Sequence, residues 1–173
     1  MGLVVDLKED IRVVGGKSPS VLRFLGLLFM DSDFLAVFLF RVYSRLYKSN
    51  ILLKVLAKIL WRFSVFFCGC YLQPQANIGK GFCLPHPIGV VIGEGASIGE
   101  FVKVYQSVTL GQGSCSEYPV IKDNVTIFAA TTIVGKITIG SGSIVGANSF
   151  VNKDVPSNCI IAGVPAKILK KVI

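Results

Sequence analysis

The chain has 173 residues, 52% of them hydrophobic, which is enough for one compact domain with a sizeable core and an appendage. Its formal net charge of +8 is divided between residues 1–72, with ten Lys/Arg against five Asp/Glu (+5), and residues 73–173, with eight against five (+3). This spread speaks against a dedicated nucleic-acid groove, whereas it suits an anionic membrane surface or a phosphorylated ligand.

The first 74 residues are predicted to form a helical region. Residues 1–20 are polar and suggest a flexible or partly helical lead that breaks at residues 15–19. Three apolar segments with interspersed Lys and Arg then predict helices over residues 21–30, 34–47 and 51–67. Asp31 to Asp33 form a typical helix N-cap, and residues 48–50 a short connection between two helices.

These helices leave two interpretations open. Charged residues interrupt each of the three segments before it reaches the length of a membrane span, so we do not expect a transmembrane helix. The apolar faces of residues 20–72 either bury against one another and a neighbouring subunit, or lie in the plane of an anionic membrane surface.

A period of six organises residues 78–157. Aliphatic residues recur at this spacing in three sets: Ile78 and Leu84; Ile92, Ile98, Val104 and Leu110; Ile121, Ile127, Ile133, Ile139, Val145 and Val151. Six fits neither an α-helix nor a lone amphipathic strand, but it fits a parallel β-helix in which three hexads make one coil. Each aliphatic residue then stacks in the core on its equivalent one coil away, at about the 4.8 Å strand spacing.

Two interruptions of the repeat mark candidate functional segments. Eight residues instead of six separate Leu84 from Ile92, which predicts a bulge around His86, the only histidine. Counting three hexads onward places Gln106 on the same side as His86, one coil away. The second interruption, residues 111–119, is polar and glycine-rich and should project as a loop that carries binding residues.

From about residue 75 to 170 the chain resembles the hexapeptide-repeat acyltransferases, and among them the serine acetyltransferase branch. The residues that carry this resemblance are His86 with the segment 89–93, the segment 108–111, and the segment 162–167. The resemblance implies a mainly β protein with a left-handed parallel β-helix over 75–173, an N-terminal helical region over 1–74, a homotrimer, and acetyl-CoA bound between neighbouring subunits. The left hand follows only from the resemblance, because parallel crossovers are normally right-handed.

The same resemblance assigns roles to individual residues. His86 matches the catalytic general base, a role that suits imidazole near neutral pH. We expect Gln106, Glu117 and Tyr118 near the acceptor, although Gln106 could equally pack without touching substrate. For acetyl-CoA the matching positions are Gly111 near the thioester, Ala129 and Ala147 along the pantetheine arm, and Lys153 and Lys167 near the phosphates, unless these lysines are solvated surface charges.

The chain also departs from the serine acetyltransferase pattern. Pro85 and Tyr71 stand where that branch has aspartates, Glu117 and Tyr118 stand where it has an Arg-His pair, and the loop is shorter. We therefore expect an acetyl-CoA-dependent O-acetyltransferase that acts on a sugar hydroxyl of a bacterial capsular or surface polysaccharide or its precursor. The alternatives are a serine O-acetyltransferase of cysteine biosynthesis and a non-catalytic β-helix binding protein.

The cysteines and the single histidine bound the remaining chemistry. Five cysteines without a CxxC pair predict reduced thiols and no metal site. We therefore expect a cytoplasmic protein, either free or in peripheral contact with the inner face of the cytoplasmic membrane. A γ-type carbonic anhydrase needs three histidines and is excluded. Cys83 and Cys115 lack a second base for activation, so direct acetyl transfer is expected over an acyl-cysteine intermediate.

Overall fold

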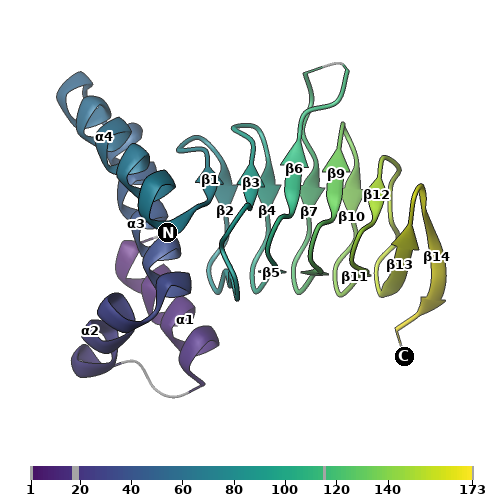
Figure 1. Ribbon diagram of the computed structural model, residues 1–173, viewed down its shortest axis with the longest axis horizontal. Helices are drawn as coiled ribbons and strands as arrows, with labels where there is room; N and C mark the ends of the chain where they lie inside the picture. Colours follow the sequence, from purple (N-terminus) through teal and green to yellow (C-terminus); the bar gives the residue numbers. More distant parts are fainter. Residues whose placement is uncertain (1, 17–19, 115, 173) are drawn as a thin grey trace.

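The computed structural model describes residues 2–16, 20–114 and 116–172, and shows a prism of stacked short strands closed at one end by helices (Figure 1). The predicted fold class, a left-handed parallel β-helix with an N-terminal helical region, is confirmed. The expected break at residues 15–19 lies partly outside the described residues. Gly15 ends the first helix and Gly16 caps it with a positive φ of 62°.

Four helices precede the strands in the described part of the chain: α1 (Leu3–Gly15), α2 (Val21–Met30), α3 (Ser32–Tyr47) and α4 (Ile51–Cys68). The three helices expected after residue 20 are confirmed as α2, α3 and α4. The Asp31 carboxylate accepts the N–H groups of Asp33 and Phe34 and so caps α3, and Asn50 caps α4 by accepting from Leu53. The polar N-terminal segment is more ordered than the sequence suggested. Its helix α1 packs on α3 through the ion pairs Asp10–Arg41 and Asp6–Arg45, which no local sequence pattern predicts.

Fourteen short strands follow in the described residues and form three sheets. The first sheet has the order β1-β3-β6-β9-β12, the second β10-β7-β4-β2, and the third β14-β13-β11-β8-β5. Their bounds are β1 Tyr71–Leu72, β2 Asn77–Ile78, β3 Val91–Ile92, β4 Ser97–Ile98, β5 Lys103–Val104, β6 Thr109–Gly111, β7 Val120–Ile121, β8 Thr126–Ile127, β9 Thr132–Val134, β10 Thr138–Ile139, β11 Ile144–Val145, β12 Phe150–Val151, β13 Cys159–Gly163 and β14 Ala166–Lys171.

The strands pair in parallel from coil to coil, which stacks the aliphatic residues of the six-residue repeat as expected. In the first sheet, Leu72, Ile92 and Leu110 are paired in register and fully buried. Ile98 with Ile121, and Val104 with Ile127, form the corresponding columns of the other two sheets. The first coil begins at β1, several residues before Ala76, because Tyr71 pairs with Val91 across the start of the prism.

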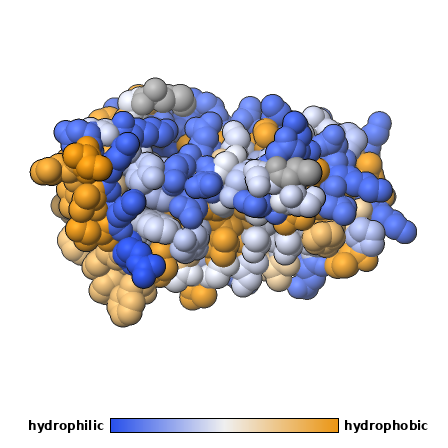
Figure 2. All heavy atoms as spheres, turned by 90° about the horizontal axis from the view of Figure 1, so that it is seen from above, coloured by the Kyte–Doolittle hydropathy of each residue, from blue (hydrophilic) through white to orange (hydrophobic). Residues whose placement is uncertain are grey.

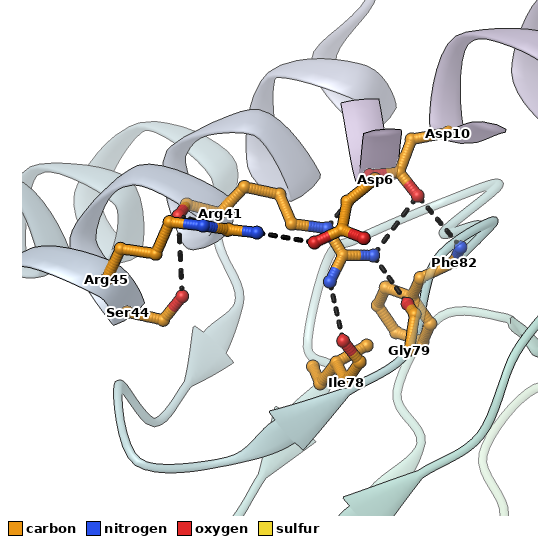
Figure 3. Close-up of polar contacts among 8 residues, drawn as sticks. All are labelled: Asp6, Asp10, Arg41, Ser44, Arg45, Ile78, Gly79 and Phe82. Carbon is orange, nitrogen blue, oxygen red and sulfur yellow. Dashed lines mark hydrogen bonds and ion pairs between the residues drawn. The ribbon is translucent and has the colours of Figure 1, made fainter. Parts of the chain in front are cut away.

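A buried ion pair closes the N-terminal end of the prism (Figure 3). Arg41 on α3 donates from Nε and Nη2 to the Asp10 carboxylate at 2.9 and 3.1 Å, and from Nη1 and Nη2 to the carbonyls of Ile78 and Gly79 at 2.6 and 2.5 Å. Asp10 in turn accepts the N–H of Phe82 at 3.1 Å. The helices thus satisfy backbone groups of the first coil that no preceding coil could pair.

At the opposite end, β14 turns back antiparallel against β13. Cys159 pairs with Lys171 and Gly163 with Ala166, so the last parallel strand has a partner on its open edge. The C-terminal edge of the third sheet is therefore covered, as Arg41 covers the N-terminal edge of the second sheet.

Candidate active site

Four of the predicted site residues lie at equivalent positions of successive coils. In the third sheet Cys83 bridges Lys103, which pairs with Thr126, which in turn pairs with Ile144. Three residues after each of these positions the chain turns towards the first sheet, at His86, Gln106, Ala129 and Ala147. We call this line of residues the His86 corner. The register count that placed Gln106 one coil from His86 agrees with this pairing.

His86 lies exposed at the surface of the prism. Its ring centroid is 6.4 Å from that of Tyr105 in the next coil, and Tyr105 stacks on Phe128 at 5.1 Å with an interplanar angle of 20°. Two backbone hydrogen bonds join the end of the bulge to the neighbouring coils. The Ile88 carbonyl accepts the N–H of Ser107, and the Gly89 N–H donates to the carbonyl of Gly69. The bulge therefore leaves the imidazole on the outside, against an aromatic ladder and open to a ligand.

Gln106, one coil from His86, has an unusual polar atom. Its side-chain Oε1 is buried and has no hydrogen-bond partner among the described residues. A buried acceptor without a donor costs free energy, so such an atom is usually satisfied by water or by a ligand. Solvent does not reach this atom, so in this conformation Oε1 is not presented to a ligand, and the position alone does not decide between substrate contact and packing.

Asp33 at the start of α3 is a charged neighbour of His86 that the sequence did not reveal. Partial burial, with the nearby charge of Asp31, raises the pKa of Asp33, while the Ser32 hydroxyl and the electrostatic attraction of His86 oppose the rise. The segment 31–33 was recognised only as a helix cap. Its position near the imidazole depends on how α3 packs against the prism, and no local sequence signal predicts this packing.

The loop residues and two cofactor positions lie at another corner. Gly111 ends β6, the middle strand of the first sheet, and the loop that follows carries Glu117 and Tyr118. Glu117 accepts an ion pair from Lys136 at 2.8 Å, and the Tyr118 hydroxyl donates to Gln112 at 3.1 Å. The structure therefore brings neither loop residue to His86 within one subunit.

The Tyr118 ring lies flat on the strand edge where two glycines leave room for it. A Cβ atom at Gly93 or at Gly95 would overlap this ring. Both glycines are thus required by the close approach of Tyr118, which holds the base of the loop against the prism.

The two predicted lysines are separated from each other. Lys153 follows Asn152, which extends the column of Gly111 and Val134, whereas Lys167 on β14 pairs with Ala162. Ala162 lies beside Gly146, so Lys167 stands at the C-terminal end of the His86 corner. Both lysines are exposed.

The cysteines offer no activated nucleophile among the described residues. Burial raises the pKa of the Cys83 thiol. The charge of Lys103 lowers this pKa, and the charges of Asp33, Asp31 and Asp10 raise it further. Burial also raises the pKa of Cys70 to about 12. Cys115 lies outside the described residues. No cluster of three His, Cys, Asp or Glu side chains in the described part of the chain is placed to bind a metal ion.

Comparison with known proteins places this site in a family. The chain is 37% identical over 167 residues to a serine acetyltransferase of Bacillus pumilus, covering 94% of this chain and 76% of that protein. The chain belongs to the serine acetyltransferase family. No protein-family model matches it.

Solved serine acetyltransferases share the fold along almost the whole chain. The Brucella abortus enzyme in complex with coenzyme A has a TM-score of 0.86 at 33% identity, covering 98% of this chain and 68% of that one. The soybean enzyme complexed with serine has a TM-score of 0.86 at 34% identity, covering 96% and 69%. The prediction that this chain is an acyltransferase is confirmed.

The prediction of a polysaccharide acceptor is wrong. It was based on the departures at Tyr71, Pro85, Glu117 and Tyr118, but the relatives that match across the helical region and the prism are serine acetyltransferases. A few substituted positions in the acceptor pocket carry less weight than similarity along 94% of the chain. The alternative with serine as acceptor agrees with the comparisons.

Proposed function

We propose that this protein is an acetyl-CoA-dependent serine O-acetyltransferase that supplies O-acetylserine for cysteine formation. The observation that supports this function most directly is the 37% identity to a serine acetyltransferase over 94% of the chain. The surface position of His86, the only imidazole in the chain, agrees with it.

In the proposed reaction His86 acts as general base. It removes the proton from the serine hydroxyl as that oxygen attacks the carbonyl carbon of the thioester. The resulting tetrahedral oxyanion collapses, the carbon–sulfur bond breaks, and the proton passes from His86 to the departing thiolate of coenzyme A. Imidazole suits both steps because it can accept and return a proton near neutral pH.

We place acetyl-CoA along the His86 corner. Successive coils stack at about 4.8 Å, so the four steps from His86 to the level of Gly163 span roughly 19 Å. Ala129 and Ala147 present small side chains on this path, and Lys167 stands at its end for the phosphates. An extended ligand can therefore lie along the corner with its thioester at the imidazole.

Gly111 and Lys153 lie across the first sheet from this path, so one subunit does not complete the site. We propose a homotrimer in which the Gly111 corner of one subunit, with Glu117 and Tyr118, faces the His86 corner of its neighbour. The exposure of His86 in the single chain is consistent with this arrangement.

Two groups of this chain take over tasks in the acceptor pocket. We propose that Asp33 stabilises the imidazolium that forms on His86, since its carboxylate already interacts electrostatically with that ring. We further propose that the Gln106 side chain turns outward when serine binds, so that its Oε1, which has no partner among the described residues, accepts a hydrogen bond from the serine ammonium. In this proposal the pocket has the carboxylate of Asp33 and the amide of Gln106. They replace the two aspartates of the serine acetyltransferase pattern, whose positions Pro85 and Tyr71 occupy here.

The test is acetyl transfer by the purified protein with L-serine and acetyl-CoA, with O-acetylserine measured by mass spectrometry. L-alanine, which lacks the hydroxyl, is the matched control and should give no product. His86→Ala should keep the fold and lose at least about a hundredfold in rate. Absence of O-acetylserine from the folded wild-type protein would overturn the proposed acceptor, and near-normal turnover by His86→Ala would overturn the mechanism.

Asp33 is tested separately from the acceptor. Asp33→Asn should lower kcat while KM for acetyl-CoA stays unchanged, because the carboxylate acts on the imidazolium and not on the cofactor. Ser32→Ala, which removes only the hydroxyl that donates to Asp33, is the matched control and should retain most of kcat. Equal kcat values for Asp33→Asn and wild type would contradict the role.

A further inference from the structure

The end of the molecule opposite the last coils is covered by exposed apolar side chains. Figure 1 places α2 and α4 at this end, and Figure 2 shows hydrophobic residues gathered there. On α2, Leu22 and Met30 are 83% and 89% exposed, and on α4, Leu52 and Phe66 are 80% and 81% exposed. We call this surface the apolar end.

Both helices contribute an exposed apolar face to this end of the molecule. On α4 the exposed large residues recur every three or four positions, from Ile51 through Ile59 to Phe67, and so share one face. The other face of α4 buries Ala57, Ser64 and Cys68. On α2 none of the residues is buried. Contiguous exposed apolar surfaces of this kind mark interaction sites.

The charges beside the apolar end identify its partner. Lys54, Lys58 and Arg62 are exposed and spaced four residues apart, which places them in one row along α4. Neither α2 nor α4 contains an acidic residue. A second copy docked through the same surface would bring two such rows together and leave them without counter-charges. An anionic surface would pair with them.

The helices suit a position in the plane of a bilayer. Among the described residues, no helix combines the length and hydrophobicity that a membrane span needs. A helix with a wide apolar face and adjacent basic residues binds at the headgroup boundary, with its apolar face inserted and its cations among the headgroups.

We propose that the apolar end docks in the plane of an anionic membrane, with α2 and α4 inserted at the interface and Lys54, Lys58 and Arg62 among the lipid headgroups. The β-helix then points away from the bilayer, with β13 and β14 farthest from it. This binding is independent of the acetyl transfer reaction.

Co-sedimentation of the full chain with vesicles tests the electrostatic part. The protein should bind vesicles of phosphatidylcholine mixed with phosphatidylglycerol, bind pure phosphatidylcholine more weakly, and be released by salt. Each basic residue at an anionic surface strengthens binding roughly fivefold, so the triple variant Lys54→Gln/Lys58→Gln/Arg62→Gln should bind about a hundredfold more weakly. Lys170→Gln/Lys171→Gln, which removes two exposed charges from β14, should bind as the wild type does.

A second pair of variants tests the apolar part. Leu52→Asn/Phe66→Asn should lose binding, whereas Ile168→Asn/Leu169→Asn should not, although Ile168 and Leu169 are 56% and 64% exposed on β14. Retained circular dichroism and acetyl transfer activity establish that each variant is folded.

Three results would overturn the proposal. The first is a wild-type protein that stays in the supernatant with anionic vesicles at low salt. The second is equal loss of binding in the variants of α4 and of β14. The third is a mass by light scattering that halves in Leu52→Asn/Phe66→Asn while neither protein binds vesicles, because a second copy would then cover the apolar end.

Discussion

Replacing Arg41 by methionine should destabilise the protein by about 3–5 kcal/mol, because it leaves the buried Asp10 without its counter-charge. Arg41 and Asp10 have side chains that are only 3% and 0% exposed. The substitution removes two hydrogen bonds to the Asp10 carboxylate and two to carbonyls of the first coil. Methionine fills much of the same space as arginine. The lost free energy of unfolding therefore comes mainly from polar groups left unpaired and only to a small extent from a cavity.

The loss should depend on pH with a definite sign. Burial already raises the pKa of Asp10, and Arg41 is the main opposing influence. Without Arg41 the folded-state pKa rises further above the unfolded value of about 3.9. A raised folded pKa gives stability that is present below the unfolded pKa and is lost as pH rises through the folded pKa. The difference between Arg41→Met and wild type should therefore be largest near neutral pH and shrink towards pH 4.

Urea unfolding followed by the fluorescence of Trp61 measures this effect. Trp61 is the only tryptophan, and its ring lies 4.9 Å from that of Tyr71 on β1, so it reports the junction between helices and prism. Protein concentrations must match, since assembly shifts apparent stability. Arg12→Met is the control, because it removes an exposed pair with Glu9 that contributes about 1 kcal/mol or less. Equal midpoints for both variants would refute the reasoning.

Three further predictions concern other parts of the chain. Cys70, whose pKa burial raises to about 12, should stay free of iodoacetamide adducts at pH 8 in the native protein and react after unfolding, as peptide mass spectrometry will show. Gly95→Ala should cost about 1–3 kcal/mol in thermal unfolding by displacing the Tyr118 ring, and the cost should vanish in a Tyr118→Ala background. Ile127→Ala should cost about 2–5 kcal/mol in urea unfolding, because it opens a cavity in a fully buried column; an unchanged midpoint would contradict the core assignment.

The prism could be predicted because one short period determines all of its contacts. A spacing of six fixes which residue of each strand points inward, so Ile98, Ile121 and Ile127 could be placed in the core without knowledge of any other contact. The interval of eight before Ile92 located the bulge at His86 for the same reason. Patterns of this kind survive in the sequence because each coil repeats the environment of the last.

Contacts between the helices and the prism had no such signal. The Asp10 carboxylate binds the N–H of Phe82, which is 72 residues away, and the charges of Asp33 and His86 influence each other only because α3 packs against the prism. A helix N-cap and a charged residue in an amphipathic helix look ordinary in sequence. The acceptor was mispredicted because a few substituted positions, such as Pro85 and Tyr71, were given more weight than the similarity along the rest of the chain.

The covered edges of the second and third sheets also limit what this protein can assemble into. A parallel solenoid is open-ended by construction, since the edge of each coil can template another chain, as in amyloid fibrils. Here Arg41 occupies the carbonyls at one edge, and at the other the reversed strand β14 exposes Lys167, Lys170 and Lys171. At these two edges the ladder positions are already occupied, so a further copy of the chain cannot extend the second sheet at one end or the third sheet at the other.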